Sequence, residues 1–125
     1  METIAAFISE GAKAFRASGA ITKGQIVKFS SEGVVAAAGL NEAGIGIADS
    51  DAADGAIVVV RLVGGAEVIA GAALATPGTF VKSDANGRAI AIDADKDKVI
   101  GYTVGVSTAA GDIIPIVIYK SLASV

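Results

Sequence analysis

Three aspartates at alternate positions, Asp93, Asp95 and Asp97, are the first candidates for chemistry in this sequence. In the segment IDADKDKVIGY they match positions 1, 3 and 5 of a calcium-binding loop, in which carboxylate oxygens surround a hard cation. Position 6 of such a loop requires glycine and is Lys98 here, and position 12 requires glutamate and is Val104. Lysines within the segment also cancel its negative charge. The pattern therefore predicts a solvated loop rather than a calcium site.

A second acidic segment, ADSDAADG, places Asp49, Asp51 and Asp54 within six residues. Three carboxylates so close together could supply oxygen ligands to a hard cation. They equally suit a polar loop before a strand that starts near Ala56, since an Asp-Gly pair is common in turns. No further ligands are visible in the surrounding sequence, so we expect a loop without a metal.

Two glycine-containing segments raise the question of phosphate binding. The segment GAITKGQ has the glycine spacing of a phosphate-binding loop, but Gln25 stands where such a loop requires lysine. The G-x-G formed by Gly44 and Gly46 is followed by no helix signal. Both segments predict tight turns, not a nucleotide site.

The residue types that most enzymes use are missing from this chain, which has no histidine and no cysteine. Ser/His/Asp and Cys/His triads are therefore impossible, and so are His/Cys zinc sites. No constellation of lysines and carboxylates replaces them. We predict that the protein is not an enzyme and uses no cofactor and no metal.

Charge and hydrophobicity narrow the classes of partner. The net charge is −3, with ten basic and thirteen acidic residues in the chain, and clustered Lys and Arg of the kind that bind nucleic acid are absent. No run approaches the roughly 20 apolar residues of a membrane span, and the first residues do not form a secretory signal. We expect no nucleic acid, no membrane, and synthesis in a cytoplasm.

The composition also indicates a partly covered surface. Hydrophobic residues make up 53% of the chain and charged residues only 18%. Large uncharged patches are poorly tolerated on a free monomer. We therefore expect a homo-oligomer, with a trimer favoured and a dimer as the alternative.

The elements that carry these segments occur twice along the chain. Residues 12–37 align with residues 66–91 at a constant displacement of 54, which brings Gly24 onto Gly78 and Gly33 onto Gly87. With small slips the match continues through later glycines, Gly46 with Gly101 and Gly55 with Gly111. Such internal repetition indicates two similar structural units.

Each copy has the pattern of β-structure. Turn signals such as SSEG and DANG recur about every ten residues, and AIVVVRLVG and IIPIVIYKS are rich in β-branched residues. Pro115 within the last segment suggests an edge strand or a bulge. We read residues 12–17 as a strand. The prediction is an all-β, compact sandwich- or barrel-like domain over residues 12–125, with repeats at about 12–62 and 66–118 and an N-terminal arm over residues 1–11.

The doubled pattern resembles that of the phage head decoration proteins, also called capsid cement proteins. The resemblance rests on the glycine-ended turns, on IVKF and FVKS, on GIGIA and IGYTV, and on the closing apolar strands. It implies an all-β fold without catalytic residues. It also implies a virion protein that binds the outer surface of an icosahedral head and clamps neighbouring major capsid protein subunits, commonly as a multimer at local symmetry axes.

The N-terminal arm departs most from this pattern. Thr3, Ile4, Phe7 and Ile8 are apolar or small and lie outside both repeats, so we predict that they form part of an adhesive surface toward the capsid or a sister subunit. Alternatively, Phe7 and Ile8 cap the β-fold. A different function, a small-ligand or carbohydrate-binding module of an adhesion apparatus, is the alternative to a cement protein. The scarcity of aromatic residues argues against it.

Overall fold

The computed structural model describes residues 11–123, which form ten strands and no helix. The first five strands are β1 (Ala12–Ala17), β2 (Ile26–Ser31), β3 (Val34–Ala37), β4 (Gly46–Ala48) and β5 (Ile57–Arg61). They close into a barrel in the order β1-β3-β2-β4-β5, in which β1 pairs in parallel with β3 and antiparallel with β5. The strand predicted over residues 12–17 is confirmed.

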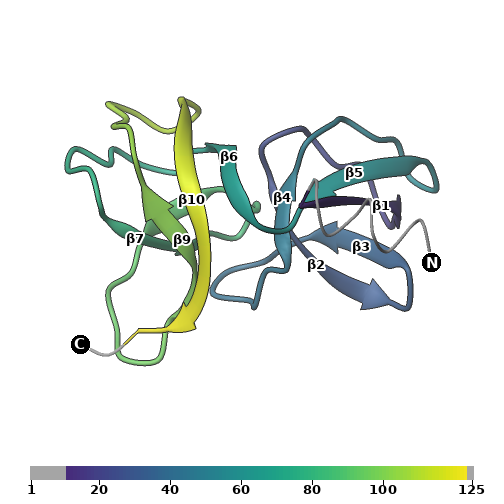
Figure 1. Cartoon of the computed structure of the whole chain (residues 1–125), viewed down its shortest axis with the longest axis horizontal. Helices are drawn as coiled ribbons and strands as arrows, with labels where there is room; N and C mark the ends of the chain where they lie inside the picture. Colours follow the sequence, from purple (N-terminus) through teal and green to yellow (C-terminus); the bar gives the residue numbers. More distant parts are fainter. Residues whose placement is uncertain (1–10, 124–125) are drawn as a thin grey trace.

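The second five strands repeat this arrangement. They are β6 (Gly64–Ile69), β7 (Phe80–Ser83), β8 (Ala89–Ala91), β9 (Lys98–Thr103) and β10 (Ile113–Leu122), in the order β6-β10-β9-β7-β8. Read in the same direction, the order around the first barrel is β1-β5-β4-β2-β3. Each strand of the first unit therefore corresponds to the strand of the second unit whose number is five higher. Only the closing contact differs: the parallel β1–β3 ladder is reduced to a single parallel bridge between Ala70 and Ala89. Figure 1 shows the two units side by side, with β4 and β6 at their junction. The predicted all-β fold of two tandem units is confirmed.

The glycines that recur in the sequence occupy equivalent backbone positions. Gly33 and Gly87 follow β2 and β7 in the hairpin turns, with φ of 72° and 73°, a region that side chains disfavour. Gly46 and Gly101 instead allow strands to approach each other. A Cβ on Gly46 would clash with the carbonyl oxygen of Arg61, and one on Gly101 with that of Val117.

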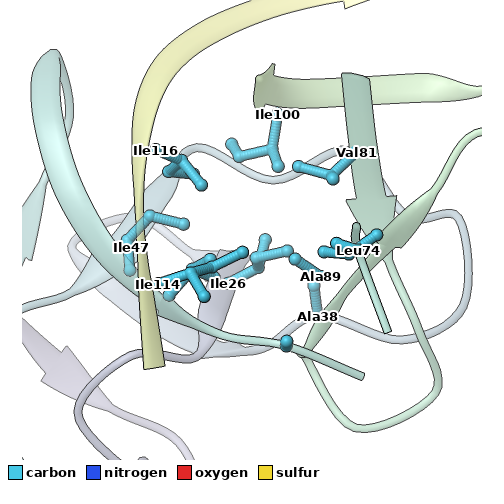
Figure 2. Close-up of a cluster of buried hydrophobic side chains, with 11 residues drawn as sticks. Ile26, Ala38, Ile47, Leu74, Val81, Ala89, Ile100, Ile114 and Ile116 are labelled. Atoms are coloured by element: carbon cyan, nitrogen blue, oxygen red, sulfur yellow. The ribbon is translucent and has the colours of Figure 1, made fainter. Parts of the chain in front are cut away.

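The start of β2 and the whole of β4 are buried on both faces. Side chains alternate between the two faces of a strand. Val27 and Ala48 pack in the core of the first barrel, whereas their neighbours Ile26 and Ile47 join the core of the second unit. Figure 2 shows Ile26 and Ile47 next to Ile114 of β10 in this shared cluster. The first unit therefore supplies part of the core of the second.

Hydrogen bonds to backbone carbonyls reinforce the junction between the units. The Ile26 N–H donates to the Gly87 carbonyl at 2.7 Å, and the Gln25 side-chain Nε2 donates to the Asn86 carbonyl at 2.8 Å. The Ile69 N–H donates to the carbonyl of the Gly24 turn at 2.9 Å. The β7–β8 hairpin thus holds the start of β2, which fixes the exposed faces of the two units relative to each other.

The expectation for Pro115 is wrong. Its strand, β10, is an inner strand that pairs with β6 on one side and β9 on the other. The register shift in β10 lies between Ile118 and Ser121, away from the proline. The ladder with β9 begins only at Ile116, paired with Thr103, so no partner strand requires an N–H from Pro115 on that side. The proline ring lies instead against Gly105, beyond the end of β9.

Candidate interaction surface

The acidic loop after β8 closes around a lysine of its own unit. Lys82 Nζ lies 2.7 Å from Asp93 Oδ1 and 2.9 Å from Asp97 Oδ2. Asp97 Oδ2 also accepts the N–H groups of Asp93 at 2.9 Å and Ala94 at 3.0 Å. The ammonium group thus takes the place that a cation would have between these carboxylates. The predicted solvated loop holds for residues 93–96, which are exposed, but not for Asp97, which is buried together with Lys82.

This buried pair shifts both pKa values. The N–H of Asp93, followed by the Lys82 ammonium, lowers the pKa of Asp97 from its ordinary 3.8 to about 2. Hydrogen bonds to Asp93 and Asp97 raise the pKa of Lys82. Each charged form is stabilised by the other, as expected for a buried ion pair whose carboxylate also accepts backbone hydrogen bonds.

Stability is expected to fall in acid because of Asp97. A carboxyl group whose pKa is lower in the folded than in the unfolded chain stabilises the fold above the unfolded value and loses that contribution as pH falls toward the folded value. The free energy of unfolding should therefore decrease between roughly pH 5 and pH 2. Urea titrations across this range should give a smaller decrease for Asp97→Asn than for the unchanged chain. Equal slopes for the two proteins would contradict this assignment.

The second acidic segment is dispersed among three separate contacts. Asp51 Oδ1 accepts the N–H of Lys23 at 2.7 Å, and Asp54 Oδ1 accepts the N–H of Gly19 at 2.8 Å. Asp49 pairs with the arginine of β5 at 3.6 Å. Within residues 11–123, no three acidic side chains gather in a way that could hold a metal ion. These aspartates tie loops to one another.

Two glycines of the segments with phosphate-loop spacing, Gly24 and Gly44, lie at the junction between the units. An added Cβ at Gly24 would lie 2.8 Å from the side chain of Ile69, and one at Gly44 would lie 3.2 Å from that of Ile100. Both positions therefore allow the two units to approach closely.

Three aromatic side chains form an exposed cluster on the second unit, here called the aromatic patch: Phe80 of β7, Tyr102 of β9 and Tyr119 of β10. The rings of Phe80 and Tyr102 are edge-to-face with centroids 6.1 Å apart, and Phe80 lies 6.3 Å from Tyr119. Phe80 is 42% exposed and Tyr119 55% exposed. Exposed aromatic clusters of this kind commonly mark interaction sites, because they bury a large area at a low cost in conformational entropy.

The first unit carries an open groove of about 540 Å³, here called the hairpin groove. Phe15 and Phe29 form its apolar floor, with ring centroids 5.7 Å apart in an edge-to-face arrangement. Phe29 is 54% exposed. The remaining lining residues come from β1 and the β2–β3 hairpin: Lys13, Ser31, Glu32 and Gly33.

Neither surface was predicted from the sequence. The residues predicted to be adhesive, Thr3, Ile4, Phe7 and Ile8, lie outside the described part of the chain. A signal for the aromatic patch was nevertheless present in the repeat. The displacement of 54 that relates the glycines places Phe80 on Ile26, so an aromatic residue replaces an aliphatic one at equivalent positions.

Among residues 11–123, no helix has the length and apolar character needed to cross a membrane.

Similarity to known proteins bears on both the fold and the family of this chain. No curated protein sequence matches the chain. Among solved structures, the head fiber gp8.5 N base of bacteriophage phi29 is similar, with a TM-score of 0.72 and 20% sequence identity. The match covers 90% of this chain and 97% of that chain, which shows a common fold. The family model described as phage cement protein matches residues 10–118. The chain therefore belongs to the phage cement protein family and is a structural protein associated with the phage capsid.

Proposed function

We propose that this protein binds the outer surface of an icosahedral phage head and bridges neighbouring subunits of the major capsid protein. The observation that carries the proposal is the family match over residues 10–118. The structure supports it with two exposed apolar surfaces on an all-β body. A net charge of −3 is also better suited to the outside of a capsid than to contact with packaged DNA.

Stabilisation of the shell follows from selective binding. A protein that binds the assembled lattice but not free subunits shifts the equilibrium toward the lattice by mass action. Once one subunit is bound, contact with its neighbour is intramolecular and gains from a high effective concentration. Both effects require a body that holds its adhesive surfaces at fixed separation. The core shared between the two units supplies that rigidity.

We further propose that the protein self-associates, with a trimer favoured, and that the N-terminal arm is adhesive. Thr3, Ile4, Phe7 and Ile8 would contribute apolar area toward the capsid or a sister subunit. The support comes from the sequence, because this apolar stretch precedes the first repeat and neither repeat requires it for its core.

Co-sedimentation with capsids tests the capsid proposal. When the protein is added to mature capsids that lack it, it should sediment with them. It should not sediment with unassembled capsid protein. Equal binding to capsids and free subunits, or no binding to capsids, would contradict it. A chain without residues 1–8 should show reduced capsid occupancy; undiminished occupancy by a folded truncated chain would remove the arm from the proposal.

A further inference from the structure

The two units of this chain meet through different faces. The first unit contributes an inserting face, in which Ile26 of β2 lies opposite Ile47 of β4. The second unit contributes a receiving face around the β7–β8 hairpin, where the Gly87 and Asn86 carbonyls accept hydrogen bonds from the first unit. Because the units are repeats, each also carries the other face. Within residues 11–123, neither the inserting face of the second unit nor the receiving face of the first is covered by another unit.

The uncovered inserting face coincides with the aromatic patch. Phe80 lies opposite Tyr102 in the β7–β9 ladder, as Ile26 lies opposite Ile47 in the β2–β4 ladder. The next pairs in the two ladders also correspond: Val81 lies opposite Gly101, as Val27 lies opposite Gly46. Ile26 and Ile47 are fully buried against the second unit, whereas Phe80 remains 42% exposed.

The uncovered receiving face coincides with the hairpin groove. At the displacement of 54, Gly87 corresponds to Gly33 and Asn86 to Glu32, and both of these counterparts line the groove. Ser83, whose carbonyl accepts an N–H from the first unit at 2.9 Å, corresponds in the same way to Phe29 of the groove floor.

We propose that the aromatic patch of one copy docks onto the hairpin groove of a second copy, so that positions equivalent to those at the junction of the two units join chains head to tail. Phe80 and Tyr102 would pack on Phe15 and Phe29. Aromatic pairs of this kind favour edge-to-face contact and bury a large apolar area. Lys13 and Glu32 would form a polar rim, the usual arrangement around an apolar interface centre.

The contact between chains differs from the internal one in its hydrogen bonds. The Gly33 carbonyl already accepts the N–H of Arg16 at 3.0 Å, because β1 closes the first barrel. The corresponding acceptor at Gly87 is used by Ile26 of the other unit. Docking between chains therefore relies on side-chain contact, and aromatic residues stand on both surfaces where the internal junction has isoleucine and serine.

Head-to-tail docking leaves one free patch and one free groove on every open assembly. Such a heterologous contact closes into a ring when the rotation between copies permits it and otherwise forms a filament. The proposal rests on the self-association proposed above but not on capsid binding. It is therefore tested in the absence of capsids.

Sedimentation equilibrium of the full chain and of two variants tests the contact. Phe80→Glu places a charge in the patch and Phe29→Glu places one in the groove. Each should weaken self-association about thirtyfold or more, the scale of a central interface residue. Ile57→Glu is the matched control. Ile57 is 55% exposed, similar to the 54% of Phe29, and it lies outside both surfaces. This variant should leave self-association unchanged.

Mixing the two variants distinguishes head-to-tail from face-to-face contact. A Phe80→Glu chain keeps its groove and a Phe29→Glu chain keeps its patch, so the equimolar mixture should form a 1:1 dimer although neither variant associates alone. Association of Phe29→Glu chains with one another, or loss of association in the Ile57→Glu control, would overturn the proposal. A monomeric unchanged chain would also overturn it and would leave the capsid proposal untouched. Circular dichroism verifies folding, and Phe80→Ala and Phe29→Ala replace any glutamate variant that unfolds.

Discussion

Replacing Ile26 with alanine is expected to lower the free energy of unfolding by about 2–5 kcal/mol, the cost of removing a large buried aliphatic side chain. Ile26 belongs to the first unit by sequence but is fully buried in the core of the second. The cavity would therefore open between the units. Because this core is shared, we also expect the units to unfold together, which is the behaviour proposed for a single domain over residues 12–125.

The two tyrosines make this prediction measurable. Tyr102 and Tyr119 both lie in the second unit, and the chain has no tryptophan. Tyrosine fluorescence therefore reports the second unit, while far-UV circular dichroism reports both. In urea, the two signals should shift together in Ile26→Ala, and exposed Ile57→Ala should change stability by less than about 0.5 kcal/mol. A tyrosine transition that stays in place while the dichroism changes would show that the units unfold independently.

Replacing Lys82 with methionine is expected to lower the free energy of unfolding by about 3–5 kcal/mol, because it leaves a buried carboxylate without its counter-charge. The methionine approximates the volume of the lysine stem, so the effect reports the ion pair more than a cavity. Asp97 would keep its two backbone hydrogen bonds but would lose Lys82, the cation paired with it in the described part of the chain.

The repeat supplies a matched control for this change. Lys28 is the counterpart of Lys82 at the displacement of 54 and pairs with Glu42 at 2.7 Å, but its side chain is 34% exposed. Exposed ion pairs contribute little, so Lys28→Met should cost no more than about 1 kcal/mol. Urea denaturation of both variants at neutral pH measures the difference. Equal losses in the two variants would show that burial of the Lys82–Asp97 pair has no special energetic role.

The acidic loops show where local sequence stops being informative. The spacing of Asp93, Asp95 and Asp97 argued against a calcium loop, because the required glycine and glutamate are missing. It did not reveal that Lys82, fifteen residues before Asp97, is the partner. That pairing depends on the approach of β7 to the loop after β8, which is a tertiary contact. Pro115 was also misjudged from local sequence. The rule that proline favours an edge strand or a bulge did not apply, because the ladder between β10 and β9 begins only at Ile116, after the proline.

The sequence by itself determined the all-β class, the doubling of the fold and the absence of histidine and cysteine chemistry. These follow from residue identity and local backbone preference: a glycine at each turn with positive φ, repeated at constant spacing, requires the same hairpin twice. The tertiary structure alone decided which apolar residues became core and which became surface. Ile26 and Phe80 hold equivalent positions in equivalent strands, yet one is buried and the other exposed, because only the first has the other unit packed against it.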